Sequence, residues 1–158
     1  MQELPHTRSC FVCGESNPQG LKLRFHTDGQ VVTAAFRPRA EHIGFKGVMH
    51  GGITATVLDE IMVWACAVAT RKFAFCAEMC VRYLQPLVPD QEYILRGKLA
   101  EDRKGRIFLA EAAVEDPTGK VMVTATGKYL PLPDVDSAKM AQDFVGDPSW
   151  LAESKRAG

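Results

Sequence analysis

The sequence has no excess of charge of either sign. Its 158 residues include 19 Lys and Arg against 19 Asp and Glu, so the formal net charge is zero. A protein that binds nucleic acid or an anionic membrane generally carries a basic excess or a basic stripe. The one local basic cluster, at 103–106, is typical of a hairpin tip. We therefore expect neither nucleic acid nor a membrane among the partners of this chain.

The chain also lacks a long apolar run. The longest apolar stretch, Ile61 to Ala69, is too short to cross a bilayer, and Asp59 and Glu60 directly precede it. The first eight residues are polar, and no signal-peptide core follows them. Five cysteines are an odd number, which predicts free thiols and not a disulfide framework. These features predict a reduced, cytoplasmic protein.

What is present is the composition of one soluble globular domain. Hydrophobic residues make up 46% of the chain and charged residues 24%. A chain of this length buries a core without help from disulfides or metals. We expect an irregular leader over 1–20, a folded domain over 21–133 and a polar tail over 134–158. Within the tail, a short helix is predicted near Ser137 to Phe144.

The pattern of apolar residues predicts six strands and one long helix. Alternation predicts strands over Leu21 to His26 and Val31 to Phe36, with a hairpin turn at Asp28-Gly29. After a glycine-rich loop over 39–52, Gly52 to Arg71 is apolar on nearly every side, which predicts a helix buried all round. Four further strands are predicted, over Phe75 to Leu84, Glu92 to Ala100, Arg106 to Glu115 and Lys120 to Leu130.

This order of elements predicts an α+β fold. The last three strands should form an antiparallel meander, because the tight connections at 102–105 and 116–119 each have Asp first and Gly fourth. That pattern suits a type I turn followed by a residue of positive φ. A long antiparallel sheet wrapped around one central buried helix is the simplest two-layer arrangement of these elements. This is the hotdog shape.

The segment from His50 to Asp59 carries the residues best suited to chemistry. Gly51 and Gly52 permit close approach to the backbone at the start of the helix, where N–H groups lack intrahelical partners and carry partial positive charge. Asp59 follows Gly52 by nearly two turns and lies on the same face, whereas Glu60 is turned away by about 80–100°. A carbonyl polariser and a carboxylate on one face are the parts needed for acyl transfer to water.

The same segment resembles a known family. His-Gly-Gly, six residues and then Asp59 is similar to the signature of hotdog thioesterases, in the PaaI-like branch of the 4-hydroxybenzoyl-CoA thioesterase superfamily. The resemblance covers about residues 21–130 and includes Tyr83 and Pro86, which are similar to the family's Tyr-x-x-Pro at the end of the strand after the helix. The segment from Cys10 to Leu23 resembles the leader of a cysteine-bearing subgroup.

The resemblance implies a role for each matching position. Asp59 is expected as general base or nucleophile, the Gly51 N–H as the group that holds the thioester carbonyl oxygen, and His50 as the residue that shapes the turn. Relatives have a Ser or Thr, supplied by the partner subunit, where this chain has Cys76, and a thiol is a weaker hydrogen-bond donor than a hydroxyl. Substrate-binding residues are expected at the four remaining candidate positions, Gly44, Gly52, Thr56 and Glu60.

The expected function is hydrolysis of a small or medium acyl- or aroyl-CoA thioester to free acid and CoA, without a cofactor. As in relatives, a homodimer or homotetramer with active sites at the subunit interface is implied. One alternative is a non-catalytic acyl-CoA-binding protein, which Cys76 favours. A hotdog acyl dehydratase ranks lower, because those enzymes usually present an Asp/His pair in a different motif.

A zinc site is the open alternative in the leader. Cys10 and Cys13 have the spacing of half a zinc site, and His6 offers a third ligand. A structural zinc site needs four ligands, and no second Cys-x-x-Cys follows. The sequence therefore predicts no bound metal.

Overall fold

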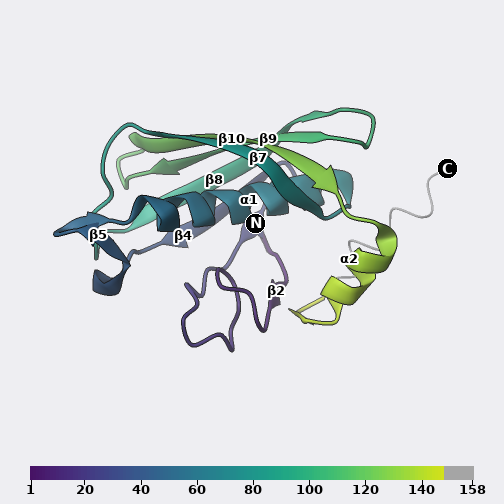
Figure 1. Ribbon diagram of the computed structural model, residues 1–158, viewed down its shortest axis with the longest axis horizontal. Coiled ribbons are helices and arrows are strands. Elements are labelled where there is room, and N and C mark those ends of the chain that lie inside the picture. Colours follow the sequence, from purple (N-terminus) through teal and green to yellow (C-terminus); the bar gives the residue numbers. More distant parts are fainter. Residues whose placement is uncertain (148–158) are drawn as a thin grey trace.

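The computed structural model describes residues 1–147, and these form a sheet packed on one long helix (Figure 1). The seven-stranded sheet is antiparallel, in the order β1-β3-β4-β8-β9-β10-β7. The predicted hotdog arrangement is confirmed. The strands of this sheet are β1 (Gln2–Glu3), β3 (His26–Thr27), β4 (Val31–Phe36), β7 (Ala74–Tyr83), β8 (Tyr93–Asp102), β9 (Phe108–Glu115) and β10 (Val121–Pro131).

Smaller elements complete the described part of the chain. Two-stranded sheets are formed by β2 (His6–Thr7) with β11 (Phe144–Val145), and by β5 (Ile43–Phe45) with β6 (Val48–Met49). The latter hairpin, preceded by a short 3₁₀ helix at Ala40–His42, lies within the predicted glycine-rich loop. The connection from β9 to β10 turns as predicted, since the Gly119 N–H donates to the Asp116 carbonyl and Gly119 has a φ of 85°. The predicted type I turn at 102–105 is wrong, because Lys104 and Gly105 both have positive φ, 55° and 68°.

The central helix α1 (Gly51–Thr70) contacts five strands of the sheet, β4, β7, β8, β9 and β10. By length and composition it could cross a membrane, but 56% of its most apolar window is buried, as in the core helix of a soluble protein. It is not buried all round as predicted. Gly52 is exposed, and Thr56, Asp59 and Val63 are half-buried, so a solvent-accessible stripe runs along one face of the helix. These positions recur at nearly whole turns, which keeps the stripe on one side.

The predicted strand over Leu21 to His26 is wrong in all but its last residue. Leu21, Leu23 and Phe25 are buried as the alternation required. However, the N–H groups of Leu21 and Leu23 donate to the carbonyls of Phe11 and Val12, and Lys22 has a φ of 61°. The segment therefore bonds to the leader in an irregular path, and only β3 joins the sheet.

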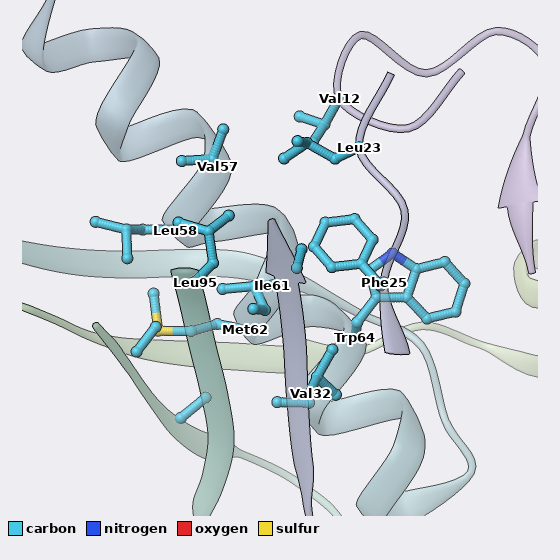
Figure 2. Packing of buried hydrophobic residues seen from close by; sticks show 14 of the residues in the cluster. Val12, Leu23, Phe25, Val32, Val57, Leu58, Ile61, Met62, Trp64 and Leu95 are labelled. Carbon is cyan, nitrogen blue, oxygen red and sulfur yellow. The ribbon is translucent and has the colours of Figure 1, made fainter. Parts of the chain in front are cut away.

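The leader covers the face of α1 that the sheet leaves free. Figure 2 shows Val12 and Leu23 beside the helix, near Phe25 and Trp64. Val12 and Leu23 are 3% and 5% exposed. Burial of each such side chain contributes about 1.5–3 kcal/mol. The leader is thus part of the core, and it is not wholly irregular because it contains β1 and β2.

The predicted helix at Ser137 to Phe144 begins and ends too late. The observed helix α2 spans Asp134–Ala141. Phe144 lies instead in β11, opposite Thr7, and packs on Trp64 and Phe73 with ring centroids 6.0 and 5.4 Å apart. Burial of this aromatic side chain against the core outweighs continuation of a polar helix. The last part of the predicted tail, 148–158, lies outside the described residues.

Candidate active site

The start of α1 is shaped by His50, which is its N-cap residue. The His50 Nδ1 accepts a hydrogen bond from the Gly52 N–H at 2.9 Å. Its carbonyl accepts from the N–H groups of Ile53 and Thr54 at 3.0 and 3.3 Å. Among the described residues, the Gly51 N–H is left as a helix N-terminal donor without a protein acceptor. Such a donor, at the positive end of the helix, is suited to hold a carbonyl oxygen.

The β5–β6 hairpin holds His50 from the other side. The His50 N–H donates to the carbonyl of His42 at 2.8 Å. Gly44 passes so close that a Cβ there would lie 3.2 Å from His50 Cδ2. Gly44 therefore allows the hairpin to approach the ring, and a larger residue would press on it.

Tyr83, at the end of β7, closes the same turn. Its hydroxyl donates to the carbonyl of Gly51 at 2.7 Å. A Cβ at Gly51 would lie 3.3 Å from Tyr83 Oη, so glycine at this position admits the phenol. Burial raises the pKa of Tyr83, which keeps its hydroxyl a donor. The Tyr-x-x-Pro motif thus fixes the end of β7 to the start of α1.

A cleft of about 540 Å³ opens beside this turn. It lies between the β5–β6 hairpin and the segment that follows β7, and its lining is mainly apolar. The residues that line it are Gly44, Phe45, Val48, Met49, His50, Gly51, Thr54, Tyr83, Leu84, Gln85, Pro86 and Leu87. The predicted residues His50, Gly51 and Gly44 therefore lie together at one cleft.

Asp59 lies two turns further along α1 and meets the sheet. Its Oδ1 accepts a hydrogen bond from the hydroxyl of Tyr129 at 2.9 Å, and the same hydroxyl is 3.4 Å from the Asp59 carbonyl. Tyr129 is fully buried, and this burial, with the negative charge of Asp59, raises its pKa. Tyr129 is therefore a permanent donor, which holds one carboxylate oxygen and leaves the other available.

Gly127 makes room for Tyr129. The two residues lie two positions apart on β10 and so on one face. A Cβ at Gly127 would lie 2.5 Å from Tyr129 Cε2, closer than side chains tolerate. Since Tyr129 is fully buried, its ring has no free space to move into. The absence of a side chain at 127 thus determines the ring position that brings the hydroxyl to Asp59.

Cys76 is part of this group within a single chain. It lies directly opposite Tyr129 in the pairing of β7 with β10. Burial raises the pKa of its thiol, and the charge of Asp59 raises it further. Within one chain Cys76 interacts with Asp59, and its expected role at the partner's site stays a prediction. The cross-strand register explains this placement, because it fixes Cys76 beside Tyr129.

Three of the four predicted substrate-binding residues do not line the cleft. Gly52 faces solvent, and Thr56 uses its hydroxyl to donate to the Gly52 carbonyl at 2.8 Å. Glu60 lies on another face of α1, where its Oε1 accepts from Trp64 Nε1 at 3.3 Å. Its burial, and then the negative charge of Cys10, raise the pKa of Glu60 to about 8. A turn of about 100° per residue separates Glu60 from Asp59, so the two carboxylates face different surroundings.

Tyr129 was not among the site residues predicted from the sequence, and Tyr83 was predicted only as part of the Tyr-x-x-Pro motif. Tyr129 lies 70 positions after Asp59 in the sequence. The alternating burial pattern of β10 marks it only as a core residue. The available signal was Gly127, a glycine inside a strand, which marks a close approach. The resulting set is a carboxylate with a fixed orientation and a helix N-terminal donor beside an apolar cleft. Asp59 and Cys76 do not line the cleft, and about 12 Å of helix rise separates Gly51 from Asp59. The two groups have the chemistry to polarise a carbonyl and to direct water or the carboxylate at it, but one chain does not bring them together.

No family model and no curated protein sequence matches this chain. Solved structures do resemble it. A thioesterase superfamily protein superposes with a TM-score of 0.71 at 26% identity, over 78% of this chain and 60% of its own length. The present chain thus spans less than two thirds of that relative.

Two further structures share the fold at lower identity. The PaaI protein of the E. coli phenylacetic acid degradation operon has a TM-score of 0.65 at 14% identity, over 72% of this chain and 81% of PaaI. A Streptococcus mutans protein solved with acetyl CoA has a TM-score of 0.64 at 15% identity, over 70% of this chain and 88% of its own. This chain is therefore a hotdog-fold protein that resembles members of the thioesterase superfamily, PaaI among them.

Proposed function

We propose that the chain hydrolyses an acyl-CoA thioester to free acid and CoA. The observation that carries this proposal is the free Gly51 N–H at the cleft, with Asp59 further along the same helix. Side chains on a helix lean toward its N-terminus, so the Asp59 carboxylate is directed toward that end. Eight residues, about 12 Å of helix rise, nevertheless separate Gly51 from Asp59. In this proposal, therefore, the donor of one protomer and the carboxylate of its partner meet a bound thioester at the subunit interface.

The reaction requires one bond to form and one to break. The Gly51 N–H donates a hydrogen bond to the thioester carbonyl oxygen and stabilises the negative charge that develops there. Asp59 either removes a proton from water as the water attacks, or attacks the carbonyl carbon itself. On the general-base route the carbon–sulfur bond then breaks and the CoA thiolate leaves, taking up the proton that Asp59 removed from water. On the nucleophilic route the same bond breaks to leave an anhydride on Asp59, and water then cleaves that anhydride, which releases the acid, restores the carboxylate and supplies the proton for the thiolate.

Tyr129 is a positioning residue in this scheme. By donating to Oδ1 it fixes the rotation of the Asp59 carboxylate, so that Oδ2 is presented to the substrate. The neutral Cys76 thiol lies where relatives carry a hydroxyl, and we propose that it donates weakly to the same carboxylate. The apolar cleft suits a small or medium acyl or aroyl group.

We also propose that the protein acts as a homodimer or a homotetramer. Within residues 1–147, β7 is the last strand of the sheet and pairs with β10 on one side, so its outer edge has no strand partner there. Phe75 and Tyr83 on this strand are 50% and 51% exposed. A second copy that pairs at this edge would cover them. Light scattering on wild type and Phe75→Asp tests this assembly, and a monomeric wild type would refute it.

Thiol release from a panel of acyl-CoA thioesters tests the function. The wild type is expected to release CoA, and Asp59→Ala to lose nearly all of the rate while it still binds acyl-CoA. Full activity in Asp59→Ala would refute the proposed mechanism. Cys76 gives a specific reason for a second candidate, a non-catalytic acyl-CoA-binding protein, because a thiol is a weaker donor than the hydroxyl of relatives. Tight binding without turnover by the wild type, at every chain length, would favour that candidate.

A further inference from the structure

Two thiols and a carboxylate converge where the leader meets α1. One ligand atom from each of Cys10, Cys13 and Glu60 lies within 4.8 Å of the other two. The Cys10 Sγ is 3.7 Å from Glu60 Oε1. Cys13 is fully buried, and the other two side chains are partly buried. This cluster lies outside the cleft and takes no part in the proposed hydrolysis.

The leader turn that presents the two thiols is closely constrained. The Val12 N–H donates to the Cys10 Sγ at 3.2 Å, a bond that stabilises negative charge on sulfur. The Gly14 N–H closes the turn onto the Cys10 carbonyl at 2.9 Å. A Cβ at Gly14 would lie 2.2 Å from that carbonyl oxygen, so no other residue fits there without movement. The chain thus holds both sulfurs on one side of a fixed turn.

The carboxylate is held equally well. The Glu60 Oε1 accepts from Trp64 Nε1 at 3.3 Å, and Trp64 is anchored by Phe73 and Phe144. None of the ion pairs among the described residues includes Glu60. A carboxylate in such surroundings is costly without a cation. An outer hydrogen bond that orients a ligand is also a regular feature of metal sites.

We propose that Cys10, Cys13 and Glu60 bind one zinc ion. Zinc takes thiolate sulfur at about 2.3 Å and carboxylate oxygen at about 2.0–2.2 Å, which sets tetrahedral ligand atoms roughly 3.5–3.8 Å apart. The Cys10 Sγ–Glu60 Oε1 distance of 3.7 Å falls within this range, and all three ligand atoms lie within 4.8 Å of one another. Two sulfur ligands select zinc over magnesium or calcium. Water, or a donor from outside the chain, completes the fourth position.

The third ligand is the feature that sequence spacing could not supply. His6, the candidate from the sequence, has its Nε2 3.2 Å from Glu15 Oε2 and is engaged there. Glu60 comes instead from α1, 50 positions after Cys10. Zinc would therefore connect the leader to the helix at the residue next to Asp59. This inference does not depend on the proposed hydrolase activity.

Cobalt and zinc titrations of the reduced full-length chain, stripped of metal with a chelator, test the site. Co²⁺ is expected to bind at one equivalent per chain with thiolate charge-transfer absorption and the visible bands of tetrahedral cobalt, and Zn²⁺ to displace it. Cys10→Ser and Cys13→Ser should each weaken binding by about tenfold or more. Cys80→Ser, which removes an exposed thiol on β7, is the matched control and should bind as the wild type does.

Glu60→Gln separates a lost ligand from a lost fold. The amide keeps the shape of the side chain and can still accept from Trp64, but it is a poor zinc ligand. Weakened metal binding with an unchanged circular dichroism spectrum is expected. The proposal is overturned if the wild type shows no saturable binding of Co²⁺ or Zn²⁺. It is also overturned if the two serine variants bind as the wild type does, or if Cys10 and Cys13 form a disulfide that resists reduction.

Discussion

Two adjacent carboxylates on α1 meet opposite surroundings. Asp59 faces the sheet, where Tyr129 donates to one oxygen. Glu60 faces the leader, where a thiol and an indole N–H approach the same oxygen. The helical turn of about 100° between these two neighbours therefore places Asp59 on a side with the parts for acyl transfer and Glu60 on a side with the parts for metal binding. The chemistry available to an acidic residue here depends on which neighbouring segment covers it.

The largest expected effect comes from neutralising each carboxylate in turn. Asp59→Asn should lower the rate of thioester hydrolysis by about 10²- to 10⁴-fold, because it removes the base or nucleophile. Glu60→Gln should retain most of that rate, since the side chain contacts Cys10 and Trp64 and takes no part in the proposed hydrolysis. Steady-state thiol release measures both.

Glu92→Gln is the control for this pair, since it neutralises an exposed carboxylate that pairs with Arg37 and lies outside both α1 and β7. Its rate should equal that of the wild type. If Glu60→Gln lost as much activity as Asp59→Asn, the division of α1 into two functional faces would be wrong.

The next effect separates the two tyrosines of the site. Tyr129→Phe leaves the Asp59 carboxylate without its buried donor and should lower the free energy of unfolding by about 1.5–3 kcal/mol. Tyr83→Phe removes a neutral bond at a half-exposed position and should cost about 1 kcal/mol. Urea denaturation at neutral pH measures both values. Equal losses of unfolding free energy in the two variants would show that burial adds nothing to the stability contributed by the Tyr129–Asp59 hydrogen bond.

Sequence reasoning recovered the elements whose signals are local. α1, β4 and the meander follow from apolar spacing and from Asp and Gly in the turns, and each matches to within a few residues. The error at Leu21 to His26 has a physical cause. Alternating burial fixes which side chains point inward, but the backbone partner was the leader, a contact that periodicity does not encode.

The candidate site was predictable only in part for the same reason. His50, Gly51 and Asp59 belong to one helix, so their spacing fixes their geometry. Tyr129 and Cys76 reach Asp59 through the pairing of β7 with β10. Cys10 reaches Glu60 across 50 positions. Such contacts depend on how the chain folds back, which a single sequence does not state.

A smaller effect is expected from filling the space under Tyr129. Gly127→Ala should destabilise the protein by about 1–3 kcal/mol, because its new methyl group overlaps the phenol ring. Thermal unfolding measures the loss. In a Tyr129→Ala background the same change should cost much less, since the ring that it meets is gone. Additive losses in the double variant would contradict the proposed contact.

The smallest effect concerns the thiols of β7. The pKa of Cys76 is raised by burial and by the charge of Asp59, so its neutral form persists to higher pH than that of an ordinary thiol. Alkylation of Cys76 should therefore lag behind that of the exposed Cys80 between about pH 7 and pH 9. Peptide mass spectrometry follows both rates. Asp59→Asn should speed the reaction of Cys76 and leave Cys80 unchanged; an unchanged Cys76 rate would exclude the electrostatic contact.

The contacts between the leader and the segment at β11 determine when the fold can be completed, because they join residues far apart in the chain. The Ser9 N–H and hydroxyl both donate to Asp143, 134 positions later. Phe144 then covers Trp64 on the side of α1 that the sheet does not reach. During synthesis, that side of the helix stays uncovered until nearly the whole described chain has emerged. Closure of so long a loop is slow, so the nascent chain exposes an aromatic surface on which a chaperone can act.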